Sequence, residues 1–176
     1  TWFEITCWIT VVVWFLATFP AWYGILFPRF VRDIDPLPGE QLPSLSIIVP
    51  ARDEAAAIEE ALRRMLSLDY PDYEVIAIND RSTDGTGAII DRLSAEIGDR
   101  LQGVHVGELP DGWLGKNHAM SVGVARSRGE FILLTDGDVM FDPLALRRAM
   151  AVVRQRQLDH LVLLPEVLTS TYFETA

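Results

Sequence analysis

Two carboxylates stand one residue apart, at Asp136 and Asp138, directly after the apolar run 131–135. A short run of branched and aromatic residues predicts a buried β-strand. The two carboxylates then lie at the carboxyl end of that strand, where open α/β sheets bind their ligands. Because Mg²⁺ typically takes one or two carboxylates together with phosphate oxygens, the pair predicts a metal–diphosphate site. The triplet alone is weak evidence, since acidic pairs are common in solvated loops.

Three further polar clusters follow other predicted strands. They are Pro50-Ala51-Arg52-Asp53-Glu54, Asn79-Asp80-Arg81-Ser82-Thr83-Asp84-Gly85-Thr86 and Trp113-Leu114-Gly115-Lys116-Asn117. The carboxyl ends of parallel strands open onto one edge of a sheet, so we expect all four clusters to meet there. A carboxylate at Asp80 can accept the imide N–H of uracil, and Lys116 can reach a phosphate near the positive end of the helix that follows it. Asp84 is interpreted as structural, a residue that bonds local amides and caps a helix.

These clusters require elements that bring them together, and strand and helix patterns alternate from residue 45 onward. Strands are predicted at 45–49, 73–78, 101–106, 131–135 and 160–164. Helices are predicted at 54–66, from 85 or 86 to 97, at 117–125 and from 142 to about 157. This order predicts an α/β fold, a mainly parallel nucleotide-binding sheet covered by helices.

The first 28 residues differ in character from the rest of the chain. No charged residue occurs from 5 to 27, and a helix of that length can cross a hydrocarbon core, which needs roughly 20 residues. A cleaved signal peptide is disfavoured because no basic region precedes the run, and a buried soluble helix would need a large surrounding core. We therefore predict a transmembrane helix at 1–28 and a linker at 29–44. Arg29 and Arg32 follow the helix, so the positive-inside rule predicts that the later residues face the cytoplasm.

Composition excludes several classes of function. The net charge of −10 argues against a nucleic-acid partner, because phosphate backbones demand a basic face. The single cysteine, Cys7, lies in the apolar run, so neither an intramolecular disulfide nor a cysteine-based metal site is expected. Ser82 has no histidine near it in the sequence, which gives no support to a nucleophilic triad.

As a set, four segments resemble the family 2 glycosyltransferases in order and spacing. They are Ile47-Ile48-Val49-Pro50-Ala51-Arg52-Asp53-Glu54, Asn79-Asp80-Arg81-Ser82-Thr83-Asp84-Gly85-Thr86, Gly112-Trp113-Leu114-Gly115-Lys116-Asn117 and Thr135-Asp136-Gly137-Asp138-Val139. The resemblance spans roughly residues 45–165. With the apolar N-terminal helix, the chain looks most like bacterial members that glycosylate lipids of the hopanoid and carotenoid type.

The resemblance implies a GT-A fold, a nucleotide-sugar donor that is commonly UDP-linked, a divalent metal (Mg²⁺ or Mn²⁺) and inversion at the anomeric carbon. It also implies a lipid or other membrane-associated acceptor and a place at the bacterial cytoplasmic membrane. Residue by residue, it implies nucleotide-sugar binding by one set of positions: Pro50, Ala51, Arg52, Glu54, Asp80, Lys116 and Asp136. Asp136 and Asp138 match the metal-binding pair. Asp53 and Asn79 depart mildly from the usual Asn and Asp.

The resemblance places the catalytic base, a carboxylate, beyond residue 176. Residues 45–176 are therefore expected to be the nucleotide-sugar-binding half of a truncated GT-A domain, inactive alone. Two alternatives stay open from the residues: a non-catalytic nucleotide-binding regulatory module, and a nucleotidyltransferase. The latter is disfavoured because its triphosphate loop is rich in glycine, and the segment after the first strand has none.

Overall fold

The computed structural model describes residues 1–26 and 30–165, without the side chains of residues 20–26. It divides into two compact units, Thr1–Ile34 and the part that begins at Asp35. The first unit contains helix α1 (Trp2–Leu26) and the short 3-10 helix η1 (Val31–Asp33). The segment Trp2–Phe19 of α1 is long and apolar enough to cross a membrane. Arg29, which carries part of the topology prediction, lies outside the described residues.

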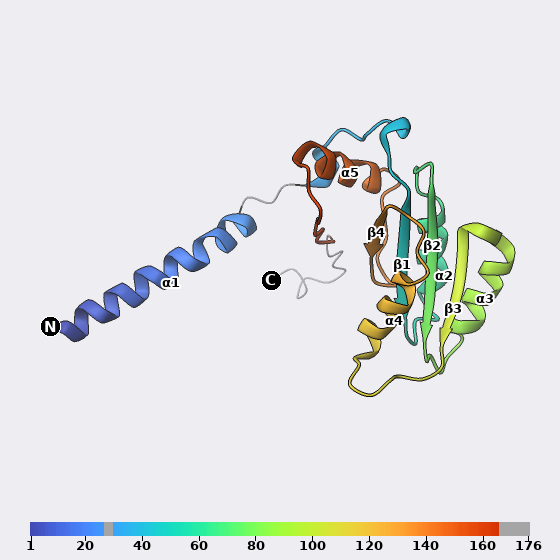
Figure 1. Ribbon diagram of the computed structural model, residues 1–176, viewed down its shortest axis with the longest axis horizontal. Coiled ribbons are helices and arrows are strands. Elements are labelled where there is room, and N and C mark those ends of the chain that lie inside the picture. Colours follow the sequence, from blue (N-terminus) through green and yellow to red (C-terminus); the bar gives the residue numbers. More distant parts are fainter. Residues whose placement is uncertain (27–29, 166–176) are drawn as a thin grey trace. The chain divides into compact units, whose positions relative to one another are not determined.

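The second unit is built on a parallel sheet, as predicted. Its strands are β1 (Leu45–Ala51), β2 (Tyr73–Asp80), β3 (Leu101–Val106) and β4 (Phe131–Leu134). Their spatial order is β3-β2-β1-β4, and every neighbouring pair is parallel (Figure 1). The chain thus adds strands on one side of β1 and then crosses to the other. Such a reversal is a topological switch point, and here it falls between β1 and β4.

Helices cover both faces of this sheet (Figure 1). The helices are α2 (Ile58–Leu66), α3 (Thr86–Ile97), α4 (Gly115–Val124) and α5 (Ala145–Arg156), with short 3-10 turns η2 (Gly39–Gln41) and η3 (Gly98–Arg100). Buried residues of α2, α3 and α5 join one hydrophobic cluster, whereas Ala119 of α4 joins a separate one. The last helix was predicted to begin at Asp142 but begins at Ala145, and the Asp142 carboxylate accepts the amide of Leu144 at 3.0 Å in the turn before it.

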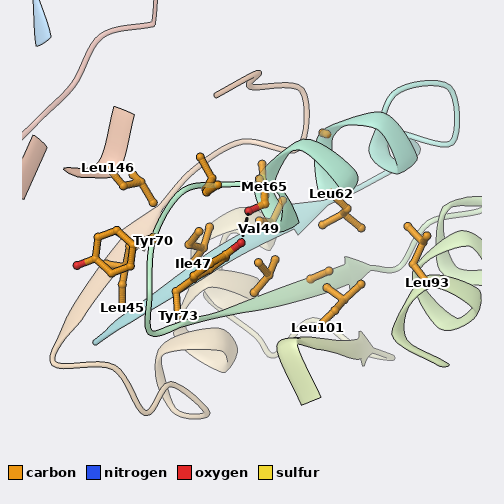
Figure 2. Packing of buried hydrophobic residues seen from close by; sticks show 14 of the residues in the cluster. Leu45, Ile47, Val49, Leu62, Met65, Tyr70, Tyr73, Leu93, Leu101 and Leu146 are labelled. Atoms are coloured by element: carbon orange, nitrogen blue, oxygen red, sulfur yellow. Dashed lines mark hydrogen bonds between the residues drawn. The ribbon is translucent and has the colours of Figure 1, made fainter. Parts of the chain in front are cut away.

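Alternation along the strands explains the two clusters. In β1, Ile47 and Val49 point into the cluster beneath α2 and α3, and Ile48 points into the cluster beneath α4. Figure 2 shows the first cluster, in which Leu62 and Met65 of α2 pack over β1. All five side chains are fully buried. At about 25 cal/mol per Å² of apolar surface, each contributes roughly 1.5–3 kcal/mol to folding.

Two expectations about strands are wrong. Strand β4 is an edge strand of the described sheet and is not buried, since Ile132 and Leu134 are 41% and 48% exposed. Residues 160–164 form no strand. Their apolar pattern suits a strand, but a strand needs a neighbour for its amides and carbonyls, and Val162 and Leu164 remain exposed.

A partly buried polar network helps to fix β4 beside β1 at the amino ends of the strands. The Ser46 hydroxyl donates to Glu74 at 2.7 Å and accepts the Gly129 amide at 2.9 Å. Glu74 in turn accepts the amide of Arg128 at 2.8 Å and its guanidinium at 2.7 and 3.0 Å. A Cβ on Gly129 would lie 2.5 Å from the Ser46 nitrogen, so only glycine permits this approach. A hollow of about 230 Å³ opens beside the network, at the edge of the sheet opposite the predicted site.

Candidate functional site at the carboxyl edge of the sheet

Asp80 ends β2 at the rim and is held in one orientation. Its side chain is only 5% exposed, and both of its oxygens accept from Arg81, Nε at 2.8 Å and Nη2 at 3.3 Å. The bond to Asp80 raises the pKa of the Arg81 guanidinium. Arg81 was not among the predicted site residues. The signal that could have found it is its place directly beside a buried carboxylate, which needs a cation.

Gly115 packs directly against this carboxylate. A Cβ at Gly115 would lie 2.7 Å from Asp80 Oδ2 and 2.6 Å from Arg81 Nη2. The connection from β3 to α4 therefore closes over the end of β2, and a side chain at this position would displace the Asp80 carboxylate or the Arg81 guanidinium. Close approach of the main chain to Asp80 explains why a glycine precedes Lys116.

Lys116, the next residue, contacts the segment that follows β4. Its ammonium forms an ion pair with the carboxylate of Asp136, and both side chains are 54% exposed. Asp80 and Asp136 thus belong to one continuous series of contacts, Asp80–Gly115 and Lys116–Asp136, joined by one peptide bond. This is the convergence that the sequence predicted for the rim.

The loop after β4 lies against the end of β1. Thr135 continues the pairing by donating its amide to the Ile48 carbonyl at 3.1 Å. A Cβ on Gly137 would lie 3.7 Å from the Ala51 Cβ and 3.8 Å from the Pro50 oxygen. The two carboxylates that flank Gly137 are therefore at the switch point between β1 and β4.

The donor set suits a hard divalent cation. Asp136 and Asp138 are both exposed at the rim, and the Asp138 carboxylate has no hydrogen bond or ion pair within the described residues. In the part of the chain that the structure describes, no three His, Cys, Asp or Glu side chains gather into a metal cluster. Two carboxylates without soft ligands fit Mg²⁺ or Mn²⁺ completed by phosphate oxygens, and do not fit an all-protein cage.

The turn after β1 is shaped differently from the prediction. Residues 54–57 are not helical, since α2 begins at Ile58. Arg52 is exposed and its Nε lies 4.0 Å from the Asp53 carboxylate. Asp53 itself has a φ of 56°, in the left-handed region. Its Oδ1 accepts the Thr83 amide at 2.7 Å, so the first residues of this turn contact the turn after β2 and do not join the helix.

Asp84 is structural, as interpreted. One of its oxygens accepts the hydroxyl and the amide of Thr86, and the other accepts the amide of Ala55 at 3.0 Å. These bonds, that from the Thr86 hydroxyl foremost, lower the pKa of the Asp84 carboxyl. Thr86 and Asp53 were not predicted to have roles, because sequence spacing alone does not reveal bonds between separate turns.

The model of glycosyl transferase family 2 matches residues 46–166, more than half of the chain, and the chain belongs to this family. The family prediction made from the four segments is confirmed.

Curated relatives match the same region. The chain is 35% identical over 101 residues to the probable glycosyltransferase YdaM of Bacillus subtilis, covering 56% of this chain and 24% of the relative. It is 35% identical over 117 residues to the beta-monoglucosyldiacylglycerol synthase of a Nostoc strain, covering 65% and 24%. It is 36% identical over 99 residues to the 4,4'-diaponeurosporenoate glycosyltransferase of Staphylococcus aureus, covering 56% and 24%. The chain therefore spans about a quarter of the length of the curated relatives it matches.

Solved structures share the fold. The mannosyltransferase PcManGT from Pyrobaculum calidifontis, in complex with GDP-Man and Mn²⁺, superposes with a TM-score of 0.57 at 28% identity, covering 78% of this chain and 39% of that one. Residues 1–349 of TarS from S. aureus, in complex with UDP-GlcNAc, give a TM-score of 0.55 at 25% identity, covering 65% and 32%. The predicted GT-A fold is confirmed.

Proposed function

We propose that this chain is the donor-binding half of a membrane-associated glycosyltransferase that transfers a sugar from a nucleotide-sugar donor with inversion. One observation carries the proposal. Asp80 at the end of β2, Gly115-Lys116 at the start of α4 and Asp136 after β4 form one contact series at the carboxyl edge of the sheet. Ligands of open α/β sheets bind at such an edge.

The donor's nucleotide binds across the ends of β1 and β2 in this proposal. Pro50, Ala51, Arg52 and Glu54 line the first turn, and Asp80 accepts the imide N–H of the base. Support comes from the fixed orientation of Asp80, whose carboxylate is buried and paired. A UDP-linked donor fits an acidic acceptor for the base, and TarS, which is similar in fold, was crystallised with UDP-GlcNAc.

The diphosphate lies farther along the rim, between Lys116 and the Asp136–Asp138 segment. These two carboxylates hold Mg²⁺ or Mn²⁺, and support comes from the exposed pair of hard oxygen ligands and from the Mn²⁺ in the PcManGT complex. When bound, such a cation stabilises the charge that develops on the departing diphosphate. Lys116 contributes a second positive charge to the same group. A carboxylate that deprotonates the acceptor hydroxyl is assigned to a part of the protein outside this chain.

The acceptor is a lipid or another molecule at the membrane, and α1 is the anchor. The apolar segment Trp2–Phe19 supports this placement, and so do relatives named for a glucosyldiacylglycerol and for diaponeurosporenoate. Arg29 and Arg32 after α1 favour a sheet domain on the cytoplasmic side of the bacterial membrane. Two reporter enzymes fused after residue 44 test this topology. We expect activity from the reporter that works only in the cytoplasm, and activity from the reporter that works only in the periplasm contradicts the topology.

Calorimetric titration with UDP in the presence of Mn²⁺ tests the donor site. The wild-type chain is expected to bind UDP more tightly when Mn²⁺ is present. The Asp138→Asn variant is expected to keep the fold and to lose this Mn²⁺-dependent binding of UDP. The matched control is Glu130→Gln, which removes one negative charge from an exposed residue at the other end of β4. Equal UDP affinity of wild type and Asp138→Asn, with Mn²⁺ present, counts against the site.

A further inference from the structure

The turns after β1 and β2 are bonded to each other in both directions. The Asp53 amide donates to the Ser82 hydroxyl at 3.1 Å, and the Thr83 amide donates to the Asp53 carboxylate at 2.7 Å. The two strands end side by side, with Ala51 in register with Asn79. Each turn therefore uses a side chain of the other to satisfy its own main chain.

A second connection between the turns is buried and passes through Thr86. This residue is fully buried at the start of α3. Its Oγ1 accepts the Glu54 amide at 2.8 Å and donates to Asp84 Oδ1 at 2.5 Å. The other oxygen of Asp84 accepts the Ala55 amide at 3.0 Å. One hydroxyl and one carboxylate thus hold two successive amides of the first turn.

We propose that Thr86 and Asp84 are positioning residues of the donor site, which set the first turn at a fixed place relative to Asp80. The inference rests on the proposed function, because it assumes that the nucleotide binds across both turns. Neither residue touches the nucleotide in this proposal. They act through the Glu54 and Ala55 amides, and through them on the placement of Arg52 and Glu54.

The main-chain conformation of the two turns supports a positioning role. Asp53 has a φ of 56° and Arg81 a φ of 58°, one in each turn. A residue with a Cβ in this left-handed region costs roughly 1–2 kcal/mol, and it persists only where its surroundings fix it. The bonds between the turns supply that restraint at Asp53. Strained residues of this kind cluster at ligand sites, and these two flank Arg52 and Asp80.

Removal of the Thr86 hydroxyl tests whether this residue positions the donor site or only stabilises the fold. Thr86→Val keeps the branched shape and leaves the Glu54 amide without its acceptor, whereas Thr86→Ser keeps the hydroxyl. Calorimetric titration of the full chain with UDP and Mn²⁺ is expected to show an affinity at least tenfold lower for Thr86→Val. Thr86→Ser is expected to bind UDP within about twofold of wild type.

Tyr70→Phe is the matched control for lost stability. The buried Tyr70 hydroxyl donates to the Pro43 carbonyl at 2.7 Å, near the amino ends of the strands and away from the rim. Its deletion also removes one buried hydrogen bond, yet UDP affinity is expected to stay unchanged. Wild-type affinity in Thr86→Val overturns the proposal, and so does an equal loss in Tyr70→Phe. A wild-type chain that binds no UDP instead overturns the proposed function, and this inference with it.

If Thr86→Val does not fold, amide hydrogen exchange on the wild-type chain provides a second test of the bonds between the turns. The Glu54 and Ala55 amides are expected to be protected before any UDP is added, because their acceptors belong to the folded protein. Exchange of both amides at the rate of an unstructured chain overturns the proposal.

Discussion

The ammonium group of Lys116 lies against the carboxylate of Asp136, so one member of the proposed metal-binding pair already has a cationic partner. A divalent cation at Asp136 has to compete with this ion pair. In the proposed site, a cation held by Asp136 would free the Lys116 ammonium to pair with the diphosphate of the donor. The proposed site therefore predicts opposite effects of Lys116, which would weaken the binding of the metal alone and strengthen the binding of the nucleotide.

Replacement of Lys116 by Met tests these opposite effects. Both side chains are about half exposed, so the ion pair contributes only about 0.2–1 kcal/mol. Removing it is expected to tighten Mn²⁺ binding without nucleotide by no more than about fivefold. The loss of a charge-assisted bond to phosphate is expected to weaken UDP binding about tenfold or more. Titration with Mn²⁺ alone and then with UDP measures both.

Lys116→Arg is the control, since it keeps the charge. It is expected to leave the Mn²⁺ affinity near that of wild type. Weaker binding of both Mn²⁺ and UDP in Lys116→Met contradicts the competition.

Gly115→Ala tests the contact between the connection to α4 and the end of β2. An added Cβ would lie 2.7 Å from Asp80 Oδ2, so the carboxylate or the main chain has to shift. We expect UDP affinity to fall about tenfold, because Asp80 leaves its position, with a smaller effect on the melting temperature. Calorimetry and thermal unfolding measure the two quantities.

Gly107→Ala is the matched control in the same connection. Its added Cβ would meet nothing within 4 Å, so UDP affinity is expected to be unchanged. Wild-type affinity in Gly115→Ala would show that Asp80 can move without loss of the base contact, which contradicts the fixed placement.

The sequence predicted the parallel sheet and the convergence at the rim because both follow from local patterns. Short continuous apolar runs such as Ile47-Ile48-Val49 predict strands buried on both faces, such as β1, and polar residues after strands mark the carboxyl edge. The start of α2 at Ile58 was missed because residues 53–55 bond to the neighbouring turn, a contact between segments far apart in sequence. The exposure of β4 was missed for a similar reason, since an apolar run does not reveal whether a strand has one neighbour or two.

Glu74→Gln tests the polar network that holds β4 in register with β1. Burial alone would raise the pKa of Glu74, but bonds from Ser46 and Arg128 outweigh it and lower the pKa below its usual 4.5. A depressed pKa means that the ionised form stabilises the folded protein above about pH 4.5, and that this stability is lost as pH falls through the folded pKa. Gln keeps one acceptor oxygen and loses the pair with the guanidinium. We expect a loss of about 1.5 kcal/mol in the free energy of unfolding at pH 7.

The pH dependence separates this charge effect from a packing effect. Urea unfolding of wild type and Glu74→Gln is expected to differ by a constant amount between pH 7 and about pH 5.5, and the difference is expected to shrink below pH 4.5 as Glu74 is protonated. Glu130→Gln, an exposed change on the first residue before β4, is expected to leave the free energy of unfolding nearly unchanged. A difference between wild type and Glu74→Gln that stays constant down to pH 3 shows that the carboxylate charge is not what holds Arg128. In that case the register of β4, and with it the placement of Asp136 at the switch point, depends on the pairing with β1, the hydroxyl of Ser46 and the close approach of Gly129.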